Sequence, residues 1–313
     1  MVNYIIRKLL NLIPILLGCM IIFFLLFNVI GGQDKVLYNM LPSKSRTPEQ
    51  IKILRHKYGL DKPLYLQYFD YIKQAVTMDF GSSLSKKQPI NKLIKRCVPV
   101  SLAVTFPPFV LDFIFATALA LVCAFNRGKF LDKLLTVLST IFIAFPYLAL
   151  IILFQTFFAG KLRLFPISGW ANDLSAIRYL ILPWILIIIS GLGGDVRYYR
   201  TVFVEEVNKD YVRTAKAKGL STRKIMFTHV LKNALIPILT NVIISIPYLF
   251  TGALLTERFF SIPGIGDLTV TAVQSYDLPV LKAMVVIYTL FFIVFSLITD
   301  ISYSIVDPRV KLS

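Results

Sequence analysis

Long stretches without a charged side chain are the feature that most restricts how this chain folds. A helix needs about 20 largely apolar residues to cross a hydrocarbon core of about 30 Å. Six stretches approach or exceed that length, at residues 9–33, 97–126, 134–160, 179–194, 233–256 and 283–299, and Asp112 is the only charged residue within them. Because 56% of the residues are apolar and the mean hydropathy is +0.70, we expect an all-α polytopic membrane protein with six transmembrane helices.

The first stretch has a second interpretation, as a cleaved signal peptide. Arg7 and Lys8 precede the apolar run that begins at Leu9. That run is longer than the roughly 7–15 residues of a signal peptide's apolar region, and no cleavage signal of small residues follows it. We therefore interpret it as an uncleaved transmembrane helix.

The basic residues predict the topology. With the N-terminus inside the cell, 16 of the 34 Lys and Arg residues fall in cytoplasmic segments and five in short outer loops. The other 13 lie in residues 34–96, a loop too long for the positive-inside rule to govern. Both termini are thus predicted to be cytoplasmic. Since the positive charges are interleaved with spans, the net charge of +17 does not indicate a nucleic-acid partner.

The outer segment 34–96 has predicted helices of its own. Pro48–Tyr58 and Leu64–Met78 have amphipathic patterns, and Gly59 separates them. The excess of basic residues in this segment indicates a solvated face, with an anionic lipid or acidic partner as the alternative. The predicted organisation is an N-terminal tip and first helix at 1–33, an extracytoplasmic helical segment at 34–96, and a five-helix core at 97–313.

The longest predicted cytoplasmic connection, residues 205–233, reads as two short helices joined by a tight corner. Asn208 or Asp210 is expected to cap a helix over about Tyr211–Lys218, Gly219 to supply a left-handed residue, and Ser221 to cap the second helix.

One face of that first helix carries Tyr211, Ala215 and Lys218 at helical spacing, and these offer an aromatic anchor, a small residue and a charge. Either a partner holds this face, or the segment is an ordinary positive-inside loop that happens to be helical.

The same loop resembles the EAA loop of a known family, the inner-membrane permeases of ABC importers for dipeptides, oligopeptides and nickel chelates (DppB/OppB type). Ala215, Gly219 and Leu231 match that motif's alanine, glycine and apolar residue. Arg213 and Lys232 replace its usual glutamate and proline, a departure that the peptide subfamily shares. Further resemblance lies in Gly59–Leu64, Gly81–Ser83, Phe260–Gly266, Asp277–Val280 and Asp307–Arg309.

The resemblance implies a type I ABC importer (MetI-like) permease fold, in which the EAA loop forms a coupling helix held in a groove of a separate ATPase. The residues implied in coupling are Asp210, Tyr211, Arg213, Thr214, Ala215, Ala217, Lys218, Gly219, Leu220, His229 and Leu231. Because the chain has no GxxxxGK[ST] phosphate loop, we expect a transport subunit that is not itself an enzyme and binds no cofactor, with ATP and Mg on its partners.

The implied partners are a second homologous permease, two ABC ATPase subunits, an extracytoplasmic substrate-binding protein and membrane lipid, in the bacterial inner membrane. The implied substrates are di- or oligopeptides, with nickel or other metal chelates and glutathione as alternatives. A proton-coupled carrier is the alternative from another class, and it would depend more heavily on Asp112.

Polar residues within the spans are candidates for lining the transport pathway. Asp112 is the only acid deep within a predicted span, and we favour a structural role for it, with a hydrogen bond to a neighbouring helix. Asn241, Ser245, Tyr248 and Thr251 form a stripe on one helix. That stripe lines the pathway or joins helices by hydrogen bonds, and the sequence does not decide between these roles.

The segment after Glu257 is too short to span a membrane. We expect it to form a re-entrant or interfacial outer gate, with Pro263, Gly264 and Gly266 as candidate gate residues. The scattered cysteines and the two histidines fit neither a metal site nor an active site.

Overall fold

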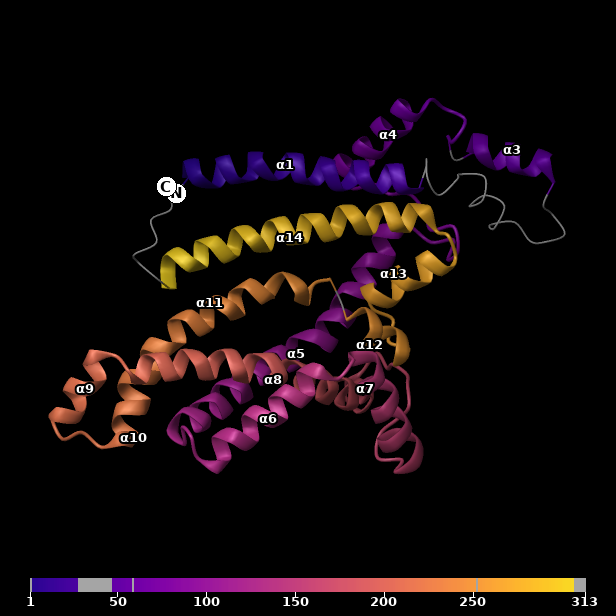
Figure 1. Ribbon diagram of the computed structural model, residues 1–313. Coiled ribbons are helices and arrows are strands. Elements are labelled where there is room, and N and C mark those ends of the chain that lie inside the picture. The colour runs from indigo at the N-terminus through magenta and orange to yellow at the C-terminus, as the bar shows by residue number, and fades with distance from the viewer. Residues whose placement is uncertain (1, 28–46, 58, 252, 307–313) are drawn as a thin grey trace. The chain divides into compact units, whose positions relative to one another are not determined.

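The structure, a computed structural model, describes residues 2–27, 47–57, 59–251 and 253–306. Within these ranges the chain is helical apart from turns, loops and one isolated bridge between Ser82 and Pro89 (Figure 1). Two compact units are present. The first unit consists of the described residues within 1–100 and 263–297, and the second consists of the described residues within 101–262 and 298–311.

Four of the predicted spans correspond to long apolar helices. Among the described residues, these helices are α5 (Ile90–Phe125), α8 (Ile177–Val207), α11 (Leu231–Leu249) and α14 (Leu278–Val306). The charge-free windows predicted at 179–194 and 283–299 were short, but α8 and α14 extend beyond them at both ends. Their length is therefore sufficient to cross a membrane.

The window at 134–160 does not form the single predicted span. It contains α6 (Phe130–Ala144) and α7 (Tyr147–Phe154), which continues into a π-helical segment at Gln155–Lys161. The axes bend by 97° between α6 and the segment from Tyr147 to Lys161. Pro146 explains the break, because proline lacks a backbone donor and disfavours a helical conformation in the residue before it. The pair is a broken span or a re-entrant loop.

Helix α1 (Val2–Leu25) corresponds to the first predicted span. Its apolar part within the described residues is Ile13–Leu25, which is shorter than a full span. Residues 28–33 of the predicted window lie outside the described residues, as do Tyr58 and the Asp307–Arg309 motif.

Both helices predicted in the outer segment are confirmed, as α3 (Pro48–Lys57) and α4 (Leu64–Thr77). Gly59 has a φ of 63°, and its amide donates to the carbonyl of His56, so it ends α3 as expected. Helix α4 buries Tyr71 in the core of the first unit, where the Tyr71 hydroxyl donates to the Lys282 carbonyl over 3.0 Å.

The first unit also joins two of the sequence motifs that lie far apart in the chain. Asp277 is fully buried, and its carboxylate accepts hydrogen bonds from the Ser83 hydroxyl over 2.6 Å and the Ser85 hydroxyl over 2.8 Å. The bonds hold the loop before α5 against the turn between α13 (Ile265–Gln274) and α14.

Several short helices complete the second unit. They are a 3₁₀ turn at Leu174–Ala176, α9 (Asp210–Ala217), α10 (Thr222–Lys224), a π-helical segment at Ile225–Val230, and α12 (Leu254–Phe259).

Helices α6 and α8 are in close contact in the second unit. A Cβ atom built on Gly193 of α8 would lie 2.8 Å from the Ile143 backbone nitrogen and 3.1 Å from the Ser139 carbonyl oxygen of α6. Small residues permit this kind of backbone approach between membrane helices. At the end of the same helix pair, Arg200 forms a two-pronged ion pair with the buried Asp132, over 2.5 and 2.8 Å.

Gly193→Ala is expected to destabilise the α6–α8 pair by about 1–3 kcal/mol, because the added methyl group overlaps backbone atoms that cannot move independently. The neighbouring Gly194→Ala is the matched control, since a Cβ there meets only the Ile143 side chain at an ordinary 3.9 Å. Thermal unfolding in detergent measures the difference. Equal stability of the two variants would show that the helices are not this close.

Candidate functional site: the cytoplasmic loop and a cavity among the helices

The corner predicted in the loop 205–233 is present. Helix α9 ends at Ala217, and Gly219 follows with a φ of 75°. Its amide donates to the Lys216 carbonyl over 2.9 Å. The Ser221 hydroxyl accepts from the Lys224 amide over 3.4 Å, so Ser221 caps the second helix as predicted.

The prediction for the start of α9 was wrong. Neither Asn208 nor Asp210 caps the helix, because Lys209 occupies the N-cap position and no side chain bonds to the exposed amides. The Asn208 amide group instead donates to the Val204 carbonyl over 2.9 Å. Asp210 is the first helical residue, where a negative charge still favours the helix dipole, and it pairs with exposed Arg213 over 3.4 Å.

The inner face of α9 anchors the loop to its own chain. Val212 and Ala215 are only 1% and 5% exposed, and they pack in an apolar cluster with α5 and α8. Tyr211 is half-buried beside them. Two of the three residues expected on a partner-facing surface are thus directed inward. The outward face consists of Asp210, Arg213, Thr214, Lys216, Ala217 and Lys218, all exposed.

Glu206, at the end of α8, holds this inner face in place. Its buried carboxylate accepts a hydrogen bond from the Tyr211 hydroxyl over 2.7 Å and also pairs with Lys209. Burial and the bond to Glu206 raise the pKa of Tyr211 to about 12, so the phenol remains a proton donor at neutral pH. Sequence analysis missed Glu206, whose only signal was the spacing of five residues between an acid and a tyrosine.

The remaining loop residues of the predicted coupling set follow α9 and lie wholly or partly against the rest of the chain. Leu220 and Leu231 pack against the same apolar cluster, and His229 is half-buried in the π-helical segment. In Figure 1, α9 and α10 lie at one end of α8, whereas α7 and α12 lie at its other end.

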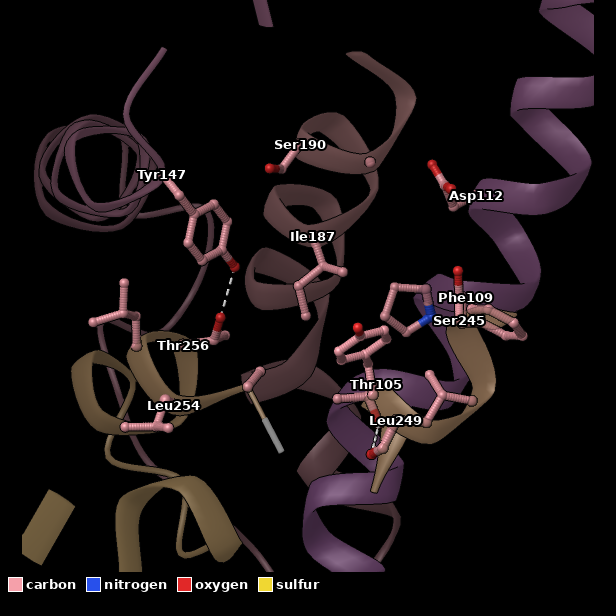
Figure 2. A pocket seen from close by; sticks show the side chains of 15 residues that line it. Thr105, Phe109, Asp112, Tyr147, Ile187, Ser190, Ser245, Leu249, Leu254 and Thr256 are labelled. Carbon is pink, nitrogen blue, oxygen red and sulfur yellow. Dashed lines mark hydrogen bonds between the residues drawn. The ribbon is translucent and has the colours of Figure 1, made fainter. Parts of the chain in front are cut away.

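A cavity of about 480 Å³ lies in the second unit among α5, α7, α8, α11 and α12. Three predicted pathway residues, Asp112, Ser245 and Tyr248, line it, whereas Asn241 and Thr251 are not among its lining residues. Figure 2 shows the Asp112 side chain extending from α5 toward α8. Asp112 forms the hydrogen bond to a neighbouring helix that the sequence favoured, with Asp195 of α8. Its Oδ1 atom, however, has no hydrogen-bond partner among the described residues.

Two of the predicted gate residues, Pro263 and Gly264, lie in the chain between α12 and α13, and the third, Gly266, lies within α13. Gly264 precedes α13, and Gly266 is buried in its first turn. Helices α12 and α13 have 6 and 10 residues, too short to span a membrane, in agreement with the expectation from sequence.

Two family sequence profiles match the chain. The "binding-protein-dependent transport system inner membrane component" matches residues 116–312, and the N-terminal component of the same system matches residues 1–105. The chain belongs to this family. It is therefore a permease of the ABC importer class and a multi-pass inner-membrane protein.

Curated permeases of this family are similar to the chain over essentially their whole length. The dipeptide transport system permease protein DppB of Lactococcus lactis is 34% identical over 313 residues, which is 100% of both chains. The glutathione transport system permease protein GsiC of Escherichia coli K12 is 31% identical over 314 residues, with 99% of each chain covered.

A solved structure supports the fold. A chain of the MetNI methionine ABC transporter, in an inward-facing conformation, aligns with a TM-score of 0.54 over 69% of this chain and 96% of that chain, at 17% sequence identity. The likeness shows the all-α type I importer permease fold.

Glu206→Ala is expected to loosen α9, because it removes a charged hydrogen-bond acceptor whose loss costs about 1.5–3 kcal/mol. The expected result is faster tryptic cleavage at Lys216 and Lys218 in the detergent-solubilised chain. Glu205→Ala is the matched control, because Glu205 is exposed. Equal cleavage rates for the two variants would contradict the anchoring role of Glu206.

Proposed function

We propose that this permease subunit imports di- or oligopeptides that an extracytoplasmic binding protein delivers. The observation that carries the proposal is the anchored, outward-facing surface of α9, because a permease that moves in response to an ATPase needs a rigid contact for it. The whole-length similarity to a dipeptide permease supports peptides as the substrate class. The glutathione permease relative keeps glutathione, itself a small peptide, as the second candidate.

The outward face of α9 is proposed to sit in a groove of an ATPase subunit. Asp210, Arg213, Thr214 and Lys218 are exposed for that contact, while Tyr211 and Ala215 connect the helix to its own bundle. Closure of two ATPases on ATP then displaces α9 as a rigid body, together with the helices on which it packs.

The topology and partners follow from the same proposal. Both termini are placed in the cytoplasm, residues 34–96 outside the membrane, and the five-helix core at 97–313 around the pathway. Pro263, Gly264 and Gly266 are assigned to an outer gate that meets the binding protein. A second homologous permease completes the pathway, and ATP and Mg bind to the ATPase partners.

Gly219→Val is expected to lower ATP-driven uptake at least about fivefold without preventing membrane insertion, because a β-branched residue is strained at positive φ. Gly128→Val is the matched control: Gly128 has a φ of 78°, and neither glycine has a neighbouring atom within 4 Å of an added Cβ. Uptake and membrane abundance are measured together. Normal uptake by the Gly219 variant would refute the coupling role.

Co-purification distinguishes the proposed importer from the alternative of a self-sufficient carrier. Mild detergent extraction of the tagged chain is expected to recover a second permease and two ATPase subunits for each complex. Recovery of a lone chain that takes up substrate in response to a proton gradient, without ATP, would refute the proposal and favour the proton-coupled alternative.

A further inference from the structure

The cavity contains a single acidic lining residue, Asp112, and this residue is in an unusual environment. Its Oδ1 atom is buried and has no hydrogen-bond partner among the residues that the structure describes. Gly191 of α8 lies directly against it, since a Cβ at that glycine would be 2.8 Å from Oδ1. A buried carboxylate is costly unless a positive charge or hydrogen-bond donors accompany it. A cationic group in the cavity would supply that positive charge.

Two of the hydroxyl groups that line the cavity, those of Thr105 and Ser245, do not supply those donors. The Thr105 hydroxyl donates to the Leu249 carbonyl over 2.9 Å, and the Ser245 hydroxyl donates to the Asn241 carbonyl over 3.1 Å. Their hydroxyl hydrogens are thus used within the protein, and only the acceptor lone pairs of these oxygens remain for a ligand. Together with Asp112, these two oxygens give the cavity three acceptor side chains.

A second carboxylate strengthens the argument for a cationic group beside Asp112. Asp195 lies one helical turn beyond Gly191 on α8, and its side chain is hydrogen-bonded to that of Asp112. Two neighbouring carboxylates repel each other when both are charged, and a cation placed beside them favours the charged forms. Without such a cation, one proton shared by the two acids leaves a single negative charge, and two protons leave an uncharged pair. The uncharged pair is the competing arrangement.

We propose that Asp112 determines specificity by binding the amino-terminal ammonium group of a peptide in this cavity. An ammonium group has one positive charge and three N–H donors, which match a carboxylate surrounded by acceptor oxygens. The volume of about 480 Å³ lies within the range of about 300–1,000 Å³ that is usual for small-ligand pockets. The inference rests on the proposed transport of peptides and adds the part of the peptide that is recognised.

The first test measures uptake by the complete importer, reconstituted with its partner permease, ATPases and binding protein. Asp112→Asn is expected to lower the uptake rate of a dipeptide with a free amino terminus about tenfold, since it leaves the ammonium group without its counter-charge. Asp112→Glu, which retains the charge, should recover part of the rate. Glu49→Gln is the matched control, because it removes an exposed acid on α3.

The outcomes of this test are distinct. Wild-type uptake by Asp112→Asn, or equal loss in the Asn and Glu variants, overturns the inference. So does equal transport of the amino-acetylated dipeptide at matched occupancy of the binding protein. A wild-type complex that imports no peptide refutes the proposed function instead.

The second test detects the charge without transport. In a chain whose native cysteines are replaced by alanine, Ser245→Cys places a thiol in the cavity, and its labelling rates with a cationic and an anionic methanethiosulfonate reagent are compared. Adding Asp112→Asn is expected to lower the cationic-to-anionic ratio about tenfold, because a charge in a low-dielectric site is weakly screened. An unchanged ratio means that the carboxyl group is uncharged and overturns the inference, whether or not peptides are transported.

Discussion

The hydrocarbon core offers no hydrogen-bond partner to a polypeptide backbone, and this constraint determines most of the architecture. Helices satisfy their backbone groups internally, so the apolar stretches form long helices. Beyond the break at Pro146 and the short helix α7 that follows it, a side chain takes over part of this role. The Gln155 side-chain amide donates to the carbonyls of Ile167 and Phe259, over 3.0 Å in each case. The Gln155 side chain therefore links its own π-helical segment to the loop at Ile167 and to the end of α12 at Phe259.

Helix α8 connects the two functional regions of the second unit. Near one end, Glu206 holds Tyr211 of α9. Further along, Gly193 permits close packing on α6, and Gly191 belongs to the wall of the cavity. A force applied to α9 thus reaches the cavity through one continuous helix, and the tight contact at Gly193 makes α6 move with it. The proposed coupling of the cavity to a partner ATPase requires this continuity.

The sequence predicted the elements whose causes are local. Charge-free windows located the long helices, and Gly219 marked the corner after α9 because only glycine adopts its positive φ readily. Other features depended on tertiary contacts. Hydropathy does not distinguish a proline that bends a helix from one that ends it, as Pro146 does. Likewise, the spacing of Tyr211 and Ala215 revealed a shared face, but not that their own chain buries it. Glu206 was missed because its partner is identified only once α8 and α9 are placed.

Asp112 illustrates how a structure changes the meaning of a charge in a membrane helix. From sequence, a hydrogen bond to a neighbouring helix was the simpler explanation, since it would satisfy the carboxyl group at no functional cost. The structure pairs Asp112 with Asp195 of that helix, but it also leaves the Oδ1 atom against Gly191 with no hydrogen-bond partner among the described residues, in a residue that lines a cavity. A binding protein that selects the substrate first and a pathway that requires an ammonium group second would act in series. The overall selectivity is then the product of the selectivities of the two steps, so each step needs only modest selectivity.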